Sequence, residues 1–110
     1  MSYTVNQTPV FVRQSERLGR KYPSWSDDLT DLQAELTANP QAGNSLGRGC
    51  YKVRVAIASK NRGKSGGARV ITLVQVIGET VLLLAVYDKS DRADLASGEL
   101  DALLTAAGLG

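Results

Sequence analysis

The chain has 110 residues, of which 43% are hydrophobic and 22% charged, and its formal net charge is +2. This length allows one hydrophobic core, so a single domain over residues 1–110 is expected; short apolar runs and an N-terminus without a signal-peptide pattern favour a cytoplasmic protein with no membrane contact. One cysteine, Cys50, and no histidine exclude an intramolecular disulfide and a Cys/His zinc site, so neither a metal nor another cofactor is expected.

The first 40 residues predict a short strand and a helical hairpin. The strand covers residues 3–6, and Thr8-Pro9 is typical of a helix start, because threonine caps backbone N–H groups and proline fits the first helical turn. Pro23 ends this helix. A second run with apolar residues at helical spacing follows and stops at Pro40, and residues 41–49, rich in Gly, Asn and Ser, are expected to form a loop.

Three strands are predicted after this loop. Apolar and polar residues alternate over residues 51–58, which indicates a strand with one buried and one wet face, and Lys52 and Arg54 make the wet face cationic. Residues 69–77 and 80–87 are apolar on both faces, as is typical of central strands.

The turn between the last two strands sets their expected register. Gly78-Glu79 predicts a two-residue type II′ hairpin. The register that follows pairs Val70 with Tyr87 and Arg69 with Asp88. Asp88 then becomes a structural partner of Arg69, unless a β-bulge shifts one strand.

The end of the chain predicts one more helix. Ser97 is the expected N-cap, acidic residues occupy the first turn, and Gly108 lies beyond the end. The order of elements predicts an α+β domain with an N-terminal helical hairpin, a twisted, mainly antiparallel β-sheet and a C-terminal helix.

The positive charges are concentrated in the middle of the sequence. No Asp or Glu lies between Leu36 and Gly78, so this segment carries +7 and the rest of the chain −5. Its cations are Arg48, Lys52, Arg54, Lys60, Arg62, Lys64 and Arg69. If the fold brings them to one side, this surface attracts phosphate backbones. The alternative is a set of solvated cations that protect strand edges from aggregation.

The stretch KNRGKSGGARV, residues 60–70, combines four of these cations with three glycines. Gly63-Lys64-Ser65 does not belong to a Walker A loop, because position 58 is alanine and a strand follows where that motif needs a helix. Glycines alone would fit a hairpin connection with positive φ angles. The added cations favour a loop whose backbone approaches a polyanion closely.

The run KNRGKSGGARVI, followed by LLLAVYDKSDRADLASGELDALL, resembles the RelE/HigB branch of toxins in bacterial type II toxin–antitoxin systems, within the RelE/ParE superfamily. The resemblance covers about residues 49–107, and its most specific part is residues 64–69 with Tyr87 and Lys89. It implies a RelE-like fold and a ribosome-dependent mRNA endoribonuclease, an mRNA interferase that inhibits translation and is neutralised by a cognate antitoxin.

RNA cleavage of this type requires deprotonation of a 2′-hydroxyl, stabilisation of charge on the phosphoryl oxygens and protonation of the leaving 5′-oxygen. By the resemblance, Arg69 suits bidentate phosphate stabilisation. Tyr87 stacks on a base or transfers a proton, with a role as a core aromatic as the alternative. Lys64 and Lys89 complete the catalytic candidates. The candidates for contacts with RNA or the ribosome are Lys52, Arg54, Lys60, Arg62 and Lys64.

Two other functions stay open at this point. A ParE-like gyrase inhibitor shares the fold and lacks RNase activity, and a catalytically degenerate module would only bind its antitoxin. The expected partners are mRNA, ribosomal RNA and an acidic antitoxin, for which a helix-turn-helix DNA-binding protein is common in this branch.

Overall fold

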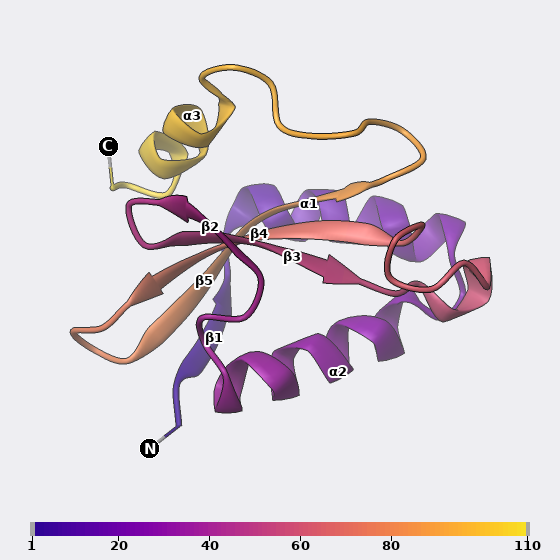
Figure 1. Cartoon of the computed structure of the whole chain (residues 1–110), viewed down its shortest axis with the longest axis horizontal. Coiled ribbons are helices and arrows are strands. Elements are labelled where there is room, and N and C mark those ends of the chain that lie inside the picture. Colours follow the sequence, from indigo (N-terminus) through magenta and orange to yellow (C-terminus); the bar gives the residue numbers. More distant parts are fainter. Residues whose placement is uncertain (1, 110) are drawn as a thin grey trace.

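The computed structural model describes residues 2–109, which form three α-helices, one short 3-10 helix and five strands (Figure 1). In chain order the elements are β1 (Thr4–Gln7), α1 (Pro9–Lys21), α2 (Trp25–Ala38), β2 (Asn44–Gly47), β3 (Cys50–Val55), η1 (Ala58–Lys60), β4 (Ala68–Gln75), β5 (Thr80–Asp88) and α3 (Glu99–Ala106). The α+β class, the helical hairpin and the C-terminal helix are confirmed. None of the helices in this described part is long and apolar enough to cross a membrane.

The strands form one sheet in the order β1-β5-β4-β3-β2. β1 pairs in parallel with β5, and the other three pairings are antiparallel, so the expectation of a mainly antiparallel sheet with β4 and β5 in its interior is confirmed. β2 corrects the prediction of an unbroken loop over residues 41–49. The sequence of β2 has no β-branched residue. A tight turn with positive φ at Gly47, Arg48 and Gly49 folds the chain back, so β2 forms a strand by pairing its backbone with β3.

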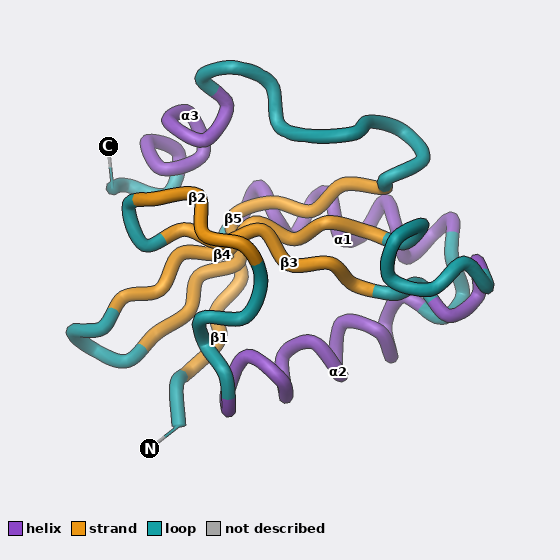
Figure 2. Tube along the Cα trace, in the orientation of Figure 1, coloured by secondary structure: helices purple, strands orange, loops and turns teal. Residues whose placement is uncertain are grey.

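Helices cover both faces of this sheet (Figure 2). α1 and α2 share one core with the sheet, in which Phe11, Trp25 and Leu36 are almost fully buried. The indole N–H of Trp25 donates to Ser15 Oγ at 2.9 Å and joins the two helices. α3 packs on the other face, where Leu103 and Leu104 contact a second cluster, which includes Ile71, Leu84 and Tyr87.

The helix starts were predicted with mixed success. Thr8 caps α1 as expected, because its Oγ1 accepts the Phe11 N–H at 3.3 Å while its hydroxyl donates to Leu83 O at 2.8 Å. Ser97 as the cap of α3 is wrong. The N-cap is Gly98 at φ 79°, and the carboxylate of Glu99 accepts the Ala96 N–H at 2.9 Å.

The β4–β5 hairpin has a different turn and register from those expected. Its loop contains four residues, 76–79, because Gln75 pairs with Thr80, and a bulge between Ile71 and Thr72 leaves Leu84 without a partner in the ladder. Compared with the expected pairing, the longer loop shifts β5 by two residues against β4, and the bulge reverses one of these two. The pairing at Arg69 therefore differs from the expected one by a single residue. Since a shift of one residue exchanges the two faces of a strand, this difference decides which side chains meet.

The corrected register separates Arg69 from Asp88. Arg69 lies opposite Tyr87, whereas Asp88 lies opposite Ala68. Successive side chains of a strand point to opposite faces, so Arg69 and Asp88 are on different sides of the sheet. Of the two alternatives that the sequence left open, the β-bulge is the one observed, and it excludes an internal ion pair between Arg69 and Asp88.

Gly67 is expected to be intolerant of any side chain. A Cβ at this position would lie 2.1 Å from Val55 O and 3.0 Å from the Ala56 Cα, which are backbone atoms at the end of β3 and just beyond it. We predict that Gly67→Ala lowers the free energy of unfolding by about 1–3 kcal/mol, measured by urea denaturation. Gly19→Ala, inside α1, is the matched control: its Cβ would have Trp25 Cδ1 of α2 as its nearest contact at 3.9 Å, and it should raise stability by about 0.5–1 kcal/mol. Equal effects of the two substitutions would contradict this packing.

Candidate functional site

Three side chains form a row across the sheet on the face that carries α3. Arg54 of β3 lies opposite Arg69 of β4, and Arg69 lies opposite Tyr87 of β5. Neighbouring strands are about 4.8 Å apart, so the row spans about 10 Å. All three residues were candidates from the sequence, and the register with its bulge brings them together.

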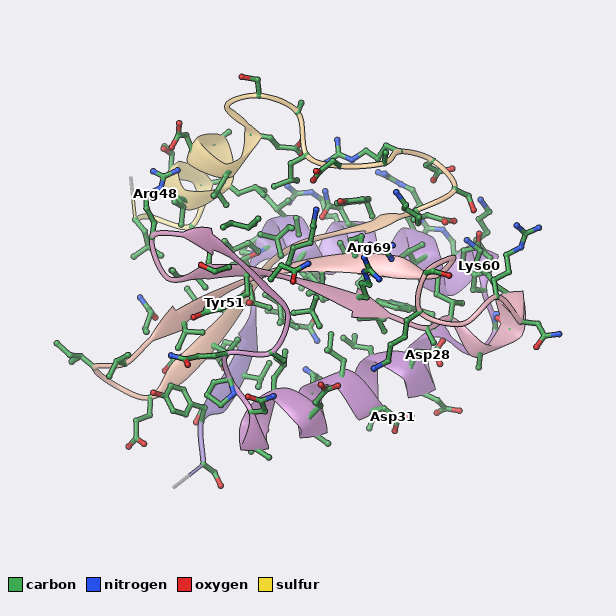
Figure 3. All side chains as sticks on the ribbon, viewed as in Figure 1. Asp28, Asp31, Arg48, Tyr51, Lys60 and Arg69 are labelled. Atoms are coloured by element: carbon green, nitrogen blue, oxygen red, sulfur yellow. The ribbon has the colours of Figure 1, made fainter. Side chains whose placement is uncertain are left out.

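Arg69 is almost completely buried, with 5% of its surface exposed, and it holds the glycine-rich loop (Figure 3). Its Nη1 donates to Lys64 O at 3.0 Å and to Ala68 O at 3.1 Å, and its Nη2 donates to Ser65 O at 3.0 Å. A guanidinium has five N–H groups, so two remain outside these three bonds. Arg69 therefore fixes the backbone that carries Lys64 and keeps donors for a further acceptor.

Tyr87 lies beneath the segment that connects β5 to α3. Only 8% of the residue is exposed, and its hydroxyl is buried without a hydrogen-bond partner among residues 2–109. The Arg92 guanidinium lies over the ring, 4.7 Å from its centroid. Burial, assisted by the charge of Asp94, raises the pKa of the Tyr87 hydroxyl, so the phenol keeps its proton at neutral pH.

Tertiary contacts neutralise part of the cationic segment. Three of its seven cations form ion pairs with Asp residues from the C-terminal part of the chain: Arg48 with Asp101, Lys52 with Asp94 at 3.2 Å, and Lys60 with Asp88 at 2.7 Å. The exposed side chains of Arg54, Arg62 and Lys64 make no ion pair within residues 2–109. The free positive surface is therefore smaller than the sequence indicated.

Lys60 points into the protein, which corrects its expected place on an RNA-binding surface. Its Nζ lies 2.7 Å from Asp88 Oδ1 and 2.7 Å from Ser90 Oγ, and 7% of its side chain is exposed. The Tyr22 hydroxyl also donates to Asp88. Although burial alone raises the pKa of Asp88, the hydrogen bonds from Lys60 and Tyr22 outweigh it and hold this pKa far below its usual range.

Lys64 and Lys89 both lie near the start of β4. Lys64 is exposed in the loop that Arg69 fixes. The Lys89 backbone N–H donates to Gly67 O at 3.0 Å, and its Nζ donates to Ala93 O at 3.3 Å. Both cations are thus anchored near the row through their backbones.

The outer edge of β3 borders two shallow hollows, because β2 pairs with β3 only as far as Lys52. Arg54 and Lys64 line both hollows. The opposite wall carries Glu35 of α2 in both hollows and also Asp28 and Asp31 in one of them; the last two are labelled in Figure 3. A polyanion is attracted to the first wall and repelled by the second. The positive charge of these hollows is therefore confined to the wall that carries Arg54 and Lys64.

Arg92 and Asp94 were not candidates from the sequence. Both lie in a segment without periodicity, and their contacts with Tyr87 and Lys52 depend on how that segment crosses the sheet. Within residues 2–109, no group of three or more Cys, Asp or Glu side chains converges as a metal site would require.

A protein-family model described as the RelE toxin of the RelE/RelB toxin–antitoxin system matches residues 13–109. Among solved structures, the E. coli toxin RelE in the free state, in a variant with two arginine-to-alanine substitutions, has a TM-score of 0.62 and 18% identity, with 98% of this chain and 96% of that chain covered. A chain of the toxin–antitoxin complex RelBE2 from Mycobacterium tuberculosis also has a TM-score of 0.62, with 22% identity and coverage of 80% and 99%, respectively. At these identities the two structures establish a shared fold.

Proposed function

This chain belongs to the RelE family of toxins of toxin–antitoxin systems, and we propose that it inhibits translation by cleaving mRNA on the ribosome. The observation that carries this proposal is the row of Arg54, Arg69 and Tyr87 across one face of the sheet, with exposed Lys64 beside it. These side chains provide the phosphate-binding and proton-donating groups that RNA cleavage needs, without a cofactor.

The reaction begins when an RNA 2′-hydroxyl loses its proton to the solvent and its oxygen attacks the adjacent phosphorus. This forms a 2′,3′-cyclic phosphate and releases the 5′-oxygen of the next nucleotide. Arg54 and the two unused N–H groups of Arg69 offset the charge that develops on the phosphoryl oxygens. Tyr87, a phenol that carries its proton at neutral pH, donates this proton to the leaving oxygen and regains one from the solvent. Lys64 and Lys89 add positive charge next to the phosphate.

The surface for mRNA and ribosomal RNA continues from the row along the loop. Arg54, Arg62 and Lys64 are exposed and have no carboxylate partner within residues 2–109, so they are available to phosphate groups. Lys52 joins them when its contact with Asp94 opens. Such contacts supply affinity that depends on salt and carries no sequence preference.

A cognate antitoxin is the protein partner that we propose. The M. tuberculosis relative was solved as a toxin–antitoxin complex. In this chain the free cations at Arg54, Arg62 and Lys64 are complementary to an acidic antitoxin segment, which would cover the surface that RNA needs. Binding of antitoxin and RNA should therefore be mutually exclusive.

We predict that Arg54→Ala slows cleavage of translated mRNA about tenfold, because one hydrogen bond to a charged phosphate is lost. Primer extension on mRNA from a translation reaction, with purified protein added, measures the rate. Arg13→Ala, which removes an equally exposed cation from α1, is the matched control and should cleave like the parent protein.

The same preparation distinguishes the alternative target. Intact mRNA in the presence of folded protein, together with inhibition of gyrase supercoiling, would reject the RNase proposal in favour of a gyrase inhibitor. Equal losses in Arg54→Ala and Arg13→Ala would show that the row does not form the site.

A further inference from the structure

The segment between β5 and α3, residues 89–98, covers the Tyr87 end of the row. It arches over the sheet on the side of α3 (Figure 1). Leu95 packs into the same cluster as Tyr87, and the Arg92 guanidinium lies 4.7 Å from the centre of the Tyr87 ring. The Tyr87 hydroxyl therefore cannot contact an RNA molecule while this cover segment is in place.

The cover segment also forms an ion pair with Lys52, a cation that RNA would otherwise bind. Asp94 Oδ1 lies 3.2 Å from Lys52 Nζ, and 63% of the Asp94 side chain and 22% of the Lys52 side chain are exposed. Lys52 lies two residues from Arg54 on the same face of β3. The Lys52 ammonium group thus holds the Asp94 carboxylate beside the row, at a place where it would otherwise bind a phosphate oxygen.

Apart from the Asp94–Lys52 ion pair, the middle of the cover segment is held by the Lys89 Nζ hydrogen bond to Ala93 O at 3.3 Å and by the Arg92 guanidinium over the Tyr87 ring. Asp88 anchors the first end by accepting the Ser90 N–H at 2.9 Å, and Glu99 anchors the second by accepting from Arg92 at 2.6 Å and from the Ala96 N–H at 2.9 Å. Between them, Leu95 is the apolar anchor, and most of the segment is exposed. Segments with so little buried apolar surface open at low free-energy cost.

Resting on the proposed function, we propose that residues 89–98 form an autoinhibitory lid and that the Asp94–Lys52 ion pair is its latch. An RNA phosphate displaces the Asp94 carboxylate from Lys52, because it offers the same acceptor with further contacts to Arg54. The segment then moves away between its anchors at Asp88 and Glu99. Tyr87 becomes accessible only in a protein that has already bound RNA, so the toxin's proton donor is covered when no substrate is present.

The test uses Asp94→Asn, with Asp101→Asn as the matched control. Asp101 forms the exposed ion pair with Arg48, so its substitution makes the same change in net charge away from the lid. Binding of a fluorescent 2′-O-methyl RNA dodecamer, which cannot be cleaved, is measured by anisotropy at fixed salt. Asp94→Asn should bind about two- to fivefold more tightly than Asp101→Asn, the ratio that corresponds to loss of a competing surface ion pair.

Hydrogen exchange provides a second test, because it measures how often the cover segment opens. Backbone amides of residues 91–97 should exchange faster in Asp94→Asn than in the parent protein or Asp101→Asn, and RNA should produce the same increase in the parent protein. Equal RNA affinities for the two variants, or unchanged exchange in Asp94→Asn, would overturn the latch and leave the RNA-binding face intact. Failure of every protein to bind RNA would overturn that face, and with it both proposals.

Discussion

Arg69→Ala should reduce the rate of mRNA cleavage by about 100- to 1,000-fold, the loss typical of removing a preorganised donor from a developing oxyanion. The side chain is held in place by three carbonyl oxygens, from Lys64, Ser65 and Ala68, so its remaining N–H groups have a fixed direction. A donor that is already oriented loses little conformational entropy in the reaction. Primer extension on ribosome-bound mRNA, at saturating protein, measures this effect.

Two further variants separate the chemical role of Arg69 from its hold on the loop. Arg69→Lys keeps the charge but cannot reach the Lys64 and Ser65 carbonyls together, so it should recover part of the activity and little of the stability. Arg20→Ala removes an exposed cation from α1 and should retain activity. Full cleavage by a folded Arg69→Ala protein would remove Arg69 from the site, whatever its effect on stability.

Asp88→Ala should lower the free energy of unfolding by about 3–5 kcal/mol, since removal of one partner leaves the other charge buried and unpaired. The Asp88 side chain is fully buried, and its carboxylate joins Lys60, the Tyr22 hydroxyl and the Ser90 N–H from three parts of the chain. Urea denaturation measures the loss. Asp101→Ala, which breaks an exposed ion pair, should cost no more than about 1 kcal/mol.

The coupling between Asp88 and Lys60 gives a sharper result. Lys60→Met should also destabilise, because the carboxylate of Asp88 then lacks its main partner. The double variant Asp88→Ala/Lys60→Met should lose less than the sum of the two single variants, since no buried charge of the pair remains. Strict additivity would contradict a direct interaction between these side chains.

Acid should weaken the same cluster. The pKa of Asp88 is depressed in the folded protein, so its contribution to stability is complete above the carboxyl pKa of the unfolded chain, about 4, and is lost as the pH falls below that value. We expect the free energy of unfolding of the parent protein to fall more steeply than that of Asp88→Asn below about pH 4. Parallel pH profiles would show that another carboxyl group controls acid unfolding.

Local sequence patterns predicted most of the fold. Proline at both ends of the hairpin, alternation from residue 51 onward and the two doubly apolar strands each specify an element through short-range physics. The strand expected over residues 51–58 ends earlier, at Val55, and Ala58 instead begins a short 3-10 helix. β2 was missed because its residues have no strand preference of their own and pair only when β3 is already present. The N-cap of α3 was predicted one residue too early: it is Gly98, with a positive φ, and not Ser97.

The candidate site shows the same division at the level of single side chains. Arg69 and Tyr87 were named from the family resemblance, but the expected register, which is off by one residue here, put them on opposite faces of the sheet. The bulge beside Ile71 places both side chains in one row. It depends on how the two strands pair, so the residue pattern of one strand does not predict it.

The sequence by itself determined that this chain is an α+β domain with a concentration of cations around a glycine-rich loop, because composition and periodicity act over a few residues. Only the tertiary structure decided which cations are free. Asp88, Asp94 and Asp101 return from the C-terminal part of the chain to neutralise Lys60, Lys52 and Arg48. Charge pairing depends on distance in space, and that distance is set by the path of the backbone across the sheet.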